Sequence, residues 1–272
     1  MTLWVDGELV DPGKPALRAD DHGVTVGDGV FETMKVIDGR PFALDRHLER
    51  LVASASGLRL AVDLEAIRSG VDTVLAAGGP SRARLRITVT AGPAPFGSDR
   101  GDAPPTVIIA TAPLSEWPPT ADVVVVPWTR NERAATAGLK TTSYADNVVA
   151  LHYAHERGAA EGIFANTRGE LCEGTGSNVF VGIGGELITP PMDSGCLAGI
   201  TRDLIVEWLG DVSERALPIT ALADADEAFL ASSTRDVQPI RTVDGRVLAA
   251  APGPLTTRAA EVFAARSAEV HS

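Results

Sequence analysis

The sequence predicts an α+β fold divided into two domains. Strand-like and helix-like segments mix irregularly and include hairpins, unlike the regular alternation of a parallel α/β sheet. A chain of 272 residues is long enough for one large domain or for two smaller ones that share a core. The pair Pro118-Pro119 is the best candidate for a boundary. We therefore expect an N-terminal α/β domain over 1–117, a linker region over 118–130 and a C-terminal α+β domain over 131–272.

The N-terminal half has the patterns of a hairpin, a long strand, two helices and two further strands. Asp-Gly pairs at 6–7 and 38–39 are typical hairpin turns. Leucines recur at helical spacing before a stop at Gly57, and Asp63 is a typical N-cap for the next helix. The basic run at 82–86 is expected to be an exposed strand face. In chain order, we expect a hairpin at 4–10, a strand from 29 to the second turn, helices within 44–58 and 63–79, and strands within 83–92 and 106–113.

The C-terminal half mixes short strands with helices, and no internal repeat or low-complexity tract interrupts them. In chain order, we expect a strand at 121–127, a helix at about 145–158, short strands near 163–166, 178–182 and 186–189, a helix after Gly199, a strand at 227–232 and a terminal helix at 254–270.

Composition narrows the functional classes. The net charge is −12 and the isoelectric point is about 4.8, which argues against nucleic acid as the main partner because phosphate neutralisation needs a Lys/Arg surface. The first residues lack a signal-peptide pattern, and no run of roughly 18 apolar residues predicts a membrane span. The two cysteines, Cys172 and Cys196, do not form a metal-type cluster. We therefore expect a reduced, cytoplasmic protein without a metal site.

Lys140 stands out because the chain has three lysines against 21 arginines. Unlike Arg, a Lys amine can lose its proton when desolvated and can then form an imine with a carbonyl group. Lys140 lies in the uncharged run TAGLKTTSY, and the nearest carboxylate in the sequence is that of Asp146. Two interpretations stay open at this point: a lysine kept for imine chemistry, and a partly exposed loop lysine in a chain whose codon usage favours Arg.

Glu173 follows 33 residues later, within RGELCEGTGSNVFV. A carboxylate at such a position can keep the ring nitrogen of a pyridine cofactor protonated, which makes the ring an electron sink. The alternative is a surface acid beside a turn. The same stretch contains a Gly-x-Gly, but it lacks the preceding parallel strand and the third glycine of a dinucleotide fingerprint.

Two further segments suit a phosphate group. Gly199, Ile200 and Thr201 begin a predicted helix, where free backbone N–H groups and the helix dipole favour an anion. Ser233 lies in a hydroxyl-rich turn after a predicted strand. Either pattern alone is also typical of ordinary helix or turn capping.

Six motifs carry a family resemblance when they are taken together and in order. They are GDGVFETMKV, HLERL, LKTTSYADN, LCEGTGSNVF, GCLAGITRDL and LASSTRDVQPI. The chain resembles the class IV aminotransferases, the fold type IV enzymes of pyridoxal phosphate, over residues 20–246. This family includes branched-chain and D-amino acid aminotransferases and 4-amino-4-deoxychorismate lyase. The step from Lys140 to Glu173 is close to the separation usual in the family.

The resemblance implies a two-domain homodimer that holds pyridoxal 5'-phosphate between its domains and acts on an amino acid and a 2-oxo acid. Lys140 matches the lysine that forms a Schiff base with the cofactor and moves the proton, and Glu173 matches the acid at the pyridine nitrogen. Arg50 of HLERL matches the arginine that binds the phosphate. The other matches are the phosphate contacts Ile200, Thr201 and Ser233, and Tyr144, which in some members bonds the cofactor's phenolic oxygen.

The resemblance also places one face of the long strand toward the substrate, which gives Phe31, Thr33 and Lys35 as pocket residues. D-amino acid aminotransferases typically hold the substrate carboxylate with an Arg-x-His pair, and the corresponding loop lacks that pair here. Arg100 or Arg130 is the alternative ligand for the carboxylate.

We therefore expect an aminotransferase that acts on a small amino acid. The main alternative is 4-amino-4-deoxychorismate lyase, which eliminates pyruvate to give 4-aminobenzoate in the folate pathway. A non-catalytic relative that keeps the fold as a binding or scaffold module is less favoured, because every cofactor-binding position is filled.

Overall fold

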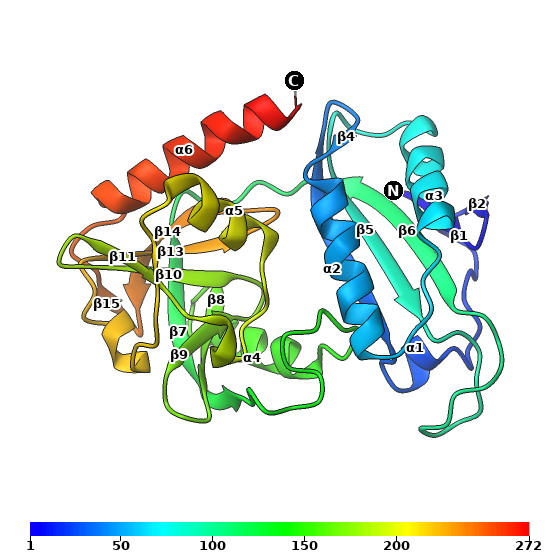
Figure 1. Cartoon of the computed structure of the whole chain (residues 1–272), viewed down its shortest axis with the longest axis horizontal. Coiled ribbons are helices and arrows are strands. Elements are labelled where there is room, and N and C mark those ends of the chain that lie inside the picture. The colour runs from blue at the N-terminus through cyan, green and yellow to red at the C-terminus, as the bar shows by residue number, and fades with distance from the viewer. Residues whose placement is uncertain (272) are drawn as a thin grey trace. The chain divides into compact units, whose positions relative to one another are not determined.

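The computed structural model describes residues 1–271, and the chain divides into two compact units (Figure 1). The N-terminal unit contains Met1–Ser115 and the short segment Leu139–Tyr144. The C-terminal unit contains Glu116–Gly138 and Ala145–Val270. The chain therefore leaves the N-terminal unit and returns to it for the segment that carries Lys140.

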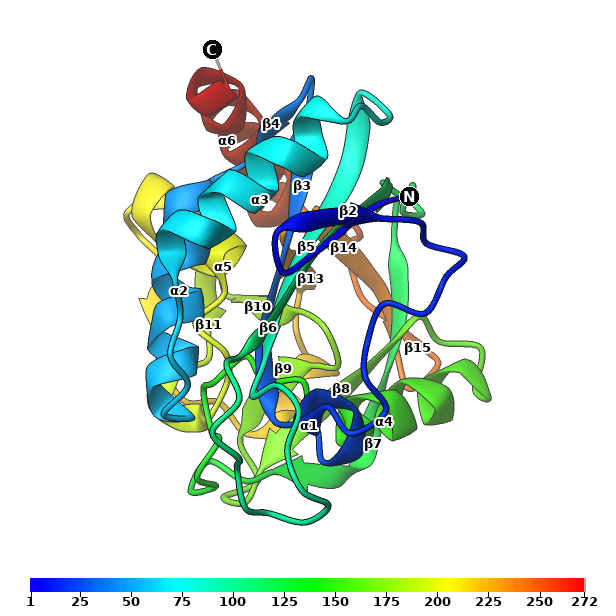
Figure 2. The same cartoon turned by 90° about the vertical axis from the view of Figure 1, so that its right-hand side faces the viewer.

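The N-terminal unit is an antiparallel sheet with helices packed against it. Within the described residues its strands follow the order β2-β1-β6-β5-β3-β4. The strands are β1 Thr2–Val5, β2 Glu8–Val10, β3 Gly29–Ile37, β4 Arg40–Pro41, β5 Arg82–Thr90 and β6 Thr106–Pro113. The helices are α1 His22–Thr25, α2 Leu44–Gly57 and α3 Leu64–Ala76. Apolar side chains of α2 and α3 form one core with the sheet that they cover (Figure 2).

Strand β3 turns alternate side chains to opposite faces of this sheet. Val30 is fully buried in the core shared with α2, whereas Phe31, Thr33 and Lys35 belong to the other face. The register of β3 with β5 pairs Thr33 with Arg86, and directly paired residues share a face. The face that carries the predicted substrate residues therefore also carries an arginine from β5.

The returning segment is fixed by backbone hydrogen bonds. The amide of Phe31 donates to the carbonyl of Lys140 at 3.0 Å, and the amide of Thr142 donates to the carbonyl of Gly29 at 2.8 Å. The amide of Lys140 donates to Oγ of Ser54 on α2 at 3.1 Å. Lys140 is therefore held against both β3 and α2, although it is more than 80 residues away from them in the sequence.

The C-terminal unit is built on a larger, mixed sheet. Within the described residues the strands follow the order β12-β11-β10-β13-β14-β7-β8-β9, with β15 beside β14. The strands are β7 Ala121–Arg130, β8 Glu161–Asn166, β9 Leu171–Gly174, β10 Asn178–Ile183, β11 Glu186–Thr189, β12 Ser213–Glu214, β13 Glu227–Ser232, β14 Asp236–Val243 and β15 Arg246–Val247. The helical elements are α4 Ala145–His155, η1 Met192–Ser194, α5 Ile200–Leu209, η2 Ile219–Leu222 and α6 Pro254–His271.

The domain organisation differs from the sequence expectation in two places. Residues 118–130, expected as a linker, include β7, which pairs in parallel with both β14 and β8 inside the sheet. Residues 139–144, expected in the C-terminal domain, belong to the N-terminal unit. Pro118 and Pro119 do lie outside the strands, immediately before β7. The strands that pair with β7 are far from it in the sequence, and local sequence patterns do not predict such pairing.

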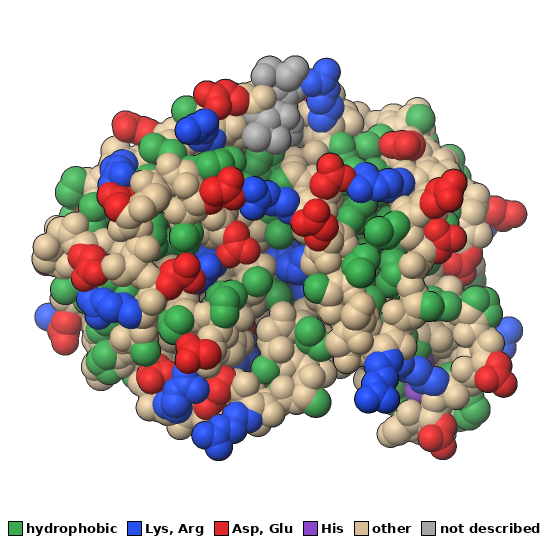
Figure 3. All heavy atoms as spheres, in the orientation of Figure 1, with side chains coloured by type: hydrophobic (Ala, Val, Ile, Leu, Met, Phe, Trp, Pro, Cys, Tyr) green, Lys and Arg blue, Asp and Glu red, His purple; other side chains and the backbone are tan. Residues whose placement is uncertain are grey.

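The surface is mixed in charge. On the face drawn in Figure 3, acidic and basic side chains are interspersed rather than gathered into one basic patch. No helix within residues 1–271 is both long enough and apolar enough to cross a membrane.

Candidate active site

The face of β3 that points away from the α2 core gathers several of the predicted site residues. Nζ of Lys140 lies 4.3 Å from the centre of the Phe31 ring and 5.9 Å from that of Tyr144. The two rings meet edge to face, with 5.2 Å between their centres. The structure therefore brings Lys140, Tyr144 and Phe31 together, and an aromatic surface lies against the amine.

The predicted phosphate arginine, Arg50, projects from α2 into a buried ionic cluster. Nε of Arg50 donates to Oε1 of Glu32 at 2.8 Å, and Nη2 donates to Oε2 at 2.7 Å. Nδ1 of His47 lies 2.6 Å from the same Oε2. The side chains of Glu32 and His47 are fully buried, and 10% of the Arg50 side chain is exposed. The sequence analysis did not single out Glu32 or His47.

Glu32 is ionised despite its burial. Burial alone would raise the pKa of Glu32, but the hydrogen bonds and charge of Arg50 and His47 outweigh it and lower that pKa to about 2. Burial lowers the pKa of His47 below its usual value, and Glu32 offsets this only in part. The cluster is therefore an ionised carboxylate that accepts hydrogen bonds from the guanidinium of Arg50 and from the imidazole of His47.

Glu173 lies on β9 in the C-terminal unit, and both of its oxygens have partners. The amide of Leu197 donates to Oε2 at 2.9 Å, and Nε of Arg130 lies 3.0 Å from Oε1. The Arg130 guanidinium also stacks on Phe164, at 4.2 Å from the ring centre. Arg130, one of the arginines considered for the substrate carboxylate, is therefore engaged by Glu173.

Helix α5 begins at Ile200, directly after Gly199, with no side-chain cap. The first amides of this helix are therefore available to an anion, as its predicted phosphate role requires. A Cβ on Gly199 would lie 1.9 Å from Oδ1 of Asn178, so glycine is needed for this close approach. Nδ2 of Asn178 donates to the carbonyl of Leu197 at 2.8 Å, which fixes the loop before the helix.

Ser233 lies in the turn between β13 and β14, and a buried ion pair supports that turn. Arg235 donates to the carboxylate of Glu161, which is 1% exposed. The same carboxylate accepts from Oγ1 of Thr175 at 2.6 Å and from the amide of Gly176 at 2.7 Å. One acid therefore holds both the Ser233 turn and the loop that follows Glu173.

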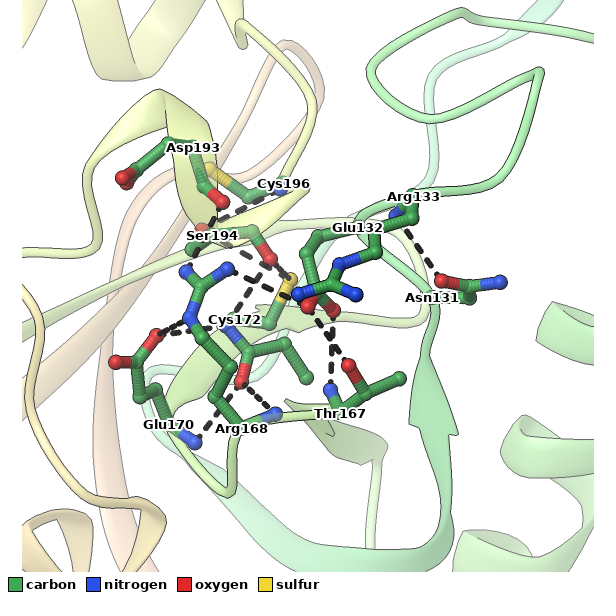
Figure 4. Close-up of polar contacts among 11 residues, drawn as sticks. Asn131, Glu132, Arg133, Thr167, Arg168, Glu170, Cys172, Asp193, Ser194 and Cys196 are labelled. Atoms are coloured by element: carbon green, nitrogen blue, oxygen red, sulfur yellow. Dashed lines mark hydrogen bonds and ion pairs between the residues drawn. The ribbon is translucent and has the colours of Figure 1, made fainter.

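A polar network connects three loops of the C-terminal unit (Figure 4). Oγ1 of Thr167 donates to Glu132 at 2.7 Å, which joins the chain after β7 to the β8–β9 turn. Arg168 donates to the carbonyl of Asp193 at 3.0 Å, which joins that turn to the loop before α5. Leu197 follows in this last loop, so the network helps to fix the amide that reaches the predicted pyridine-facing acid.

Cys172 and Cys196 lie beside this network as buried thiols without a disulfide. Burial raises the pKa of Cys196 to about 11 and raises that of Cys172 further. Sγ of Cys172 donates to the carbonyl of Ser194 at 3.3 Å. Both cysteines therefore have the properties of packing residues rather than of nucleophiles.

Arg100 was predicted from the sequence to be a pocket residue, but its guanidinium is hydrogen-bonded to other groups. Its Nε and Nη2 donate to both oxygens of Asp28, at 2.6 Å and 2.5 Å, and its Nη1 donates to the carbonyl of Leu58 at 2.7 Å. These bonds tie the loop after β5 to the start of β3 and to the end of α2. Arg100 therefore has the contacts of an anchor for this loop.

Arg86 is a further candidate site residue that the sequence analysis did not single out. Its guanidinium carbon lies 3.8 Å from the centre of the Phe31 ring, on the ring that Lys140 also contacts. Within residues 1–271 no carboxylate lies at ion-pair distance from Arg86. Desolvation lowers its pKa, but a guanidinium stays charged at neutral pH. The run at 82–86 indicated only an exposed basic strand, because the register that sets Arg86 opposite Thr33 is not visible in the sequence.

The other two predicted pocket residues lie on the same face of β3. Lys35 is 7% exposed, and its Nζ lies 4.8 Å from the centre of the Phe42 ring. Thr33 pairs with Arg86 across the strands. The β3 face therefore combines an amine, an aromatic surface and an arginine. Such groups can bind a substrate that carries both an amino group and a carboxylate.

Comparisons with known proteins identify the family of this chain. Residues 29–243 match the family model described as "Amino-transferase class IV". The chain is 31% identical over 265 residues to an archaeal relative from Methanocaldococcus jannaschii, covering 91% of this chain and 90% of the relative. It is 31% identical over 296 residues to the "Bifunctional aminodeoxychorismate lyase / D-amino acid transaminase" of Mycobacterium tuberculosis, covering 97% of this chain and 96% of that protein.

A solved structure resembles the whole chain. The branched-chain aminotransferase of Thermoproteus uzoniensis with norvaline superposes with a TM-score of 0.89 at 29% identity, covering 99% of this chain and 95% of that chain. Because the family model spans most of the sequence and the relatives align over nearly all of it, the chain belongs to the class IV aminotransferase family.

Proposed function

We propose that this protein is a pyridoxal phosphate-dependent aminotransferase that moves an amino group between an amino acid and a 2-oxo acid through Lys140. The observation that carries the proposal is the β3 face, where the amine of Lys140 lies against Phe31 and Arg86 stacks on the same ring. A group suited to proton transfer and a group suited to a substrate carboxylate therefore contact the same ring, in a chain that belongs to the class IV family.

The residues that would hold the cofactor fit its chemical parts. Bound pyridoxal phosphate supplies an electron sink for the substrate α-carbon. Arg50, the first amides of α5 at Ile200 and Thr201, and Ser233 suit the phosphate. Glu173, fixed by Leu197 and Arg130, suits a protonated ring nitrogen, and Tyr144 suits the phenolic oxygen.

Lys140 would have two tasks. It would hold the cofactor covalently at rest, and its amine, once the substrate has displaced it, would take the proton from the substrate α-carbon and deliver it to the cofactor carbon. The rings of Phe31 and Tyr144 lie beside this amine, with their centres 4.3 Å and 5.9 Å from Nζ.

The substrate carboxylate is assigned to Arg86 rather than to Arg100. Arg100 already donates to Asp28 and to a backbone carbonyl, so an anion would have to displace an existing ion pair. Nε of Arg86 donates to Oγ1 of Thr88 at 3.1 Å, but no carboxylate among the described residues pairs with Arg86, and a guanidinium can bind a carboxylate through two parallel hydrogen bonds.

The attachment of the cofactor can be tested directly. Borohydride reduction of the protein with bound pyridoxal phosphate, followed by peptide mass mapping, should place the label on the peptide that contains Lys140. A label on Lys14 or Lys35 would overturn the assignment, and a Lys140→Ala protein serves as the unlabelled control.

The related lyase is the second candidate, because a relative aligned over 97% of this chain is named for both activities. Lys140 and the electron sink serve amino transfer and elimination alike, so the pocket must decide between them. Alanine of either hand, or a branched-chain amino acid, with 2-oxoglutarate should yield a new 2-oxo acid. In a parallel assay, rapid pyruvate release from aminodeoxychorismate with negligible amino transfer would move the assignment to the lyase.

The active form is further proposed to be a homodimer, as the family resemblance implies. Sedimentation of the purified protein should give a species of about twice the 28.3 kDa chain mass. A stable monomer with full activity would contradict this.

A further inference from the structure

We infer that Glu32 is a positioning residue, which fixes the guanidinium of Arg50 so that the phosphate of the cofactor meets it in one orientation. The inference rests on the proposed function, because it takes Arg50 as a phosphate ligand. It concerns an acid that does not itself touch the cofactor in this assignment and acts only through its contacts with Arg50.

The geometry supports a fixed guanidinium. Glu32 accepts two parallel bonds from Arg50, at 2.8 Å from Nε and 2.7 Å from Nη2, and these bonds set both the position and the plane of the guanidinium. Glu32 itself stands within β3, where it pairs with Ile87 of β5, and is fully buried. A long, flexible side chain on α2 is therefore tied to a buried group on a strand of the sheet.

His47 holds the acid in turn. It lies three residues before Arg50 on α2, on the same side of the helix, and its Nδ1 is 2.6 Å from Oε2 of Glu32. Both oxygens of Glu32 therefore have fixed partners. The carboxylate cannot rotate without breaking contacts to two residues of α2, so the orientation that it imposes on Arg50 is well defined.

The charges in this cluster allow a decisive test, because two explanations predict opposite changes in the affinity for the phosphate. Glu32 is ionised and burial disfavours the charged form of His47, so Glu32 cancels the charge of Arg50 and the cluster is close to neutral. If Arg50 acted on the phosphate only as a point charge, removing the negative charge of Glu32 would strengthen phosphate binding. If orientation dominates, the same change would weaken it.

The experiment is a titration of apoprotein with pyridoxal phosphate and, separately, with pyridoxal, which lacks the phosphate. Glu32→Gln should weaken binding of pyridoxal phosphate about tenfold, the loss expected for one well-placed charge-assisted hydrogen bond, and should leave pyridoxal binding unchanged. Unchanged or tighter binding of pyridoxal phosphate would overturn the inference.

Two further variants guard against a simple loss of structure. Glu227→Gln removes another buried carboxylate, which accepts from the first amides of α6 in the other unit, and should leave the affinity for pyridoxal phosphate unchanged. Glu32→Asp keeps the charge but withdraws the carboxylate by one methylene. If Glu32→Gln does not fold, weaker binding by Glu32→Asp supports the inference, and wild-type binding by that variant overturns it.

Failure of the inference and failure of the proposed function are distinguishable. A wild-type protein that binds no pyridoxal phosphate would refute the function. If the wild type binds it and Arg50→Lys weakens that binding, while Glu32→Gln does not, only the positioning role is lost.

Discussion

At the scale of single residues, the partners of each arginine indicate which one can receive a substrate. Arg100 binds Asp28 through two nitrogens, whereas Arg86 rests on Phe31 with no acid partner among the described residues. We expect Arg86→Ala to lower kcat/KM for the amino acid substrate about 10- to 100-fold, mainly by raising KM, because a charge-assisted carboxylate contact is lost. Steady-state kinetics would measure this effect.

A matched control for this prediction lies on the same strand. Arg82 has the same parity on β5 and is exposed, so Arg82→Ala removes one positive charge from the same side of the sheet. It should leave KM nearly unchanged. Equal effects of the two variants would mean that general electrostatic attraction, and not a local contact of Arg86, raises the affinity.

Glu32 should also make stability depend on pH in a defined range. Its pKa is lowered from 4.5 to about 2 in the folded protein, so the stabilisation is complete above the unfolded pKa and is lost as the pH falls from 4.5 toward 2. The stability advantage of the wild type over Glu32→Gln should therefore shrink by about 2 kcal/mol between pH 6 and pH 3. Urea unfolding of both proteins at both pH values measures this difference in stability. Parallel pH profiles of the two proteins would contradict the prediction.

At the scale of elements, local patterns predicted well and long-range pairing did not. The hairpin at 4–10, the helices α2, α3 and α6 and the strand β13 follow from Asp-Gly turns, caps and periodicity. The return of residues 139–144 to β3 depends on hydrogen bonds to residues over 80 positions away. Lys140 was identified by its chemistry and by the motif, but the hydrogen bonds that hold its segment in place could not be predicted from the sequence.

The contact between α2 and this returning segment gives an element-scale prediction. Ser54 is 2% exposed, and its Oγ accepts from the amide of Lys140. Ser54→Ala leaves that amide without its acceptor, which should cost about 1 to 3 kcal/mol of stability and lower kcat, since the lysine is held less firmly. Ser56→Ala, two residues further along α2 on its exposed side, is the control. Thermal unfolding and turnover should be unaffected by the control.

The missed members of the candidate site have a common physical reason. The proposed roles of Glu32, His47 and Arg86 depend on contacts between elements, namely α2 with β3 and β5 with β3. In the sequence, Glu32 is one more residue of an alternating strand, and His47 is one more residue of an amphipathic helix. The residues that the sequence did identify carry either rare chemistry, like Lys140, or a motif match, like Glu173.

At the scale of the whole molecule, the proposed cofactor ligands come from segments that are far apart in the sequence. Lys140 and Arg50 belong to the N-terminal unit, and Glu173 and the start of α5 belong to the C-terminal unit. A ligand that binds only the folded form stabilises it by mass action, by about 2.7 kcal/mol at a free concentration 100 times the dissociation constant. If the two sets of residues bind the same molecule, that stabilisation must extend to both sets.

Hydrogen exchange with and without pyridoxal phosphate would test this expectation. Added cofactor should slow exchange in the segment 139–144 and in the first turn of α5 over the same concentration range, because one binding event orders both. Pyridoxal should protect the lysine segment but not the α5 turn, since it has no phosphate to meet those amides. Protection confined to one of these two segments at saturating pyridoxal phosphate would mean that the other segment does not contact the cofactor, and the assignment of its residues would have to be abandoned.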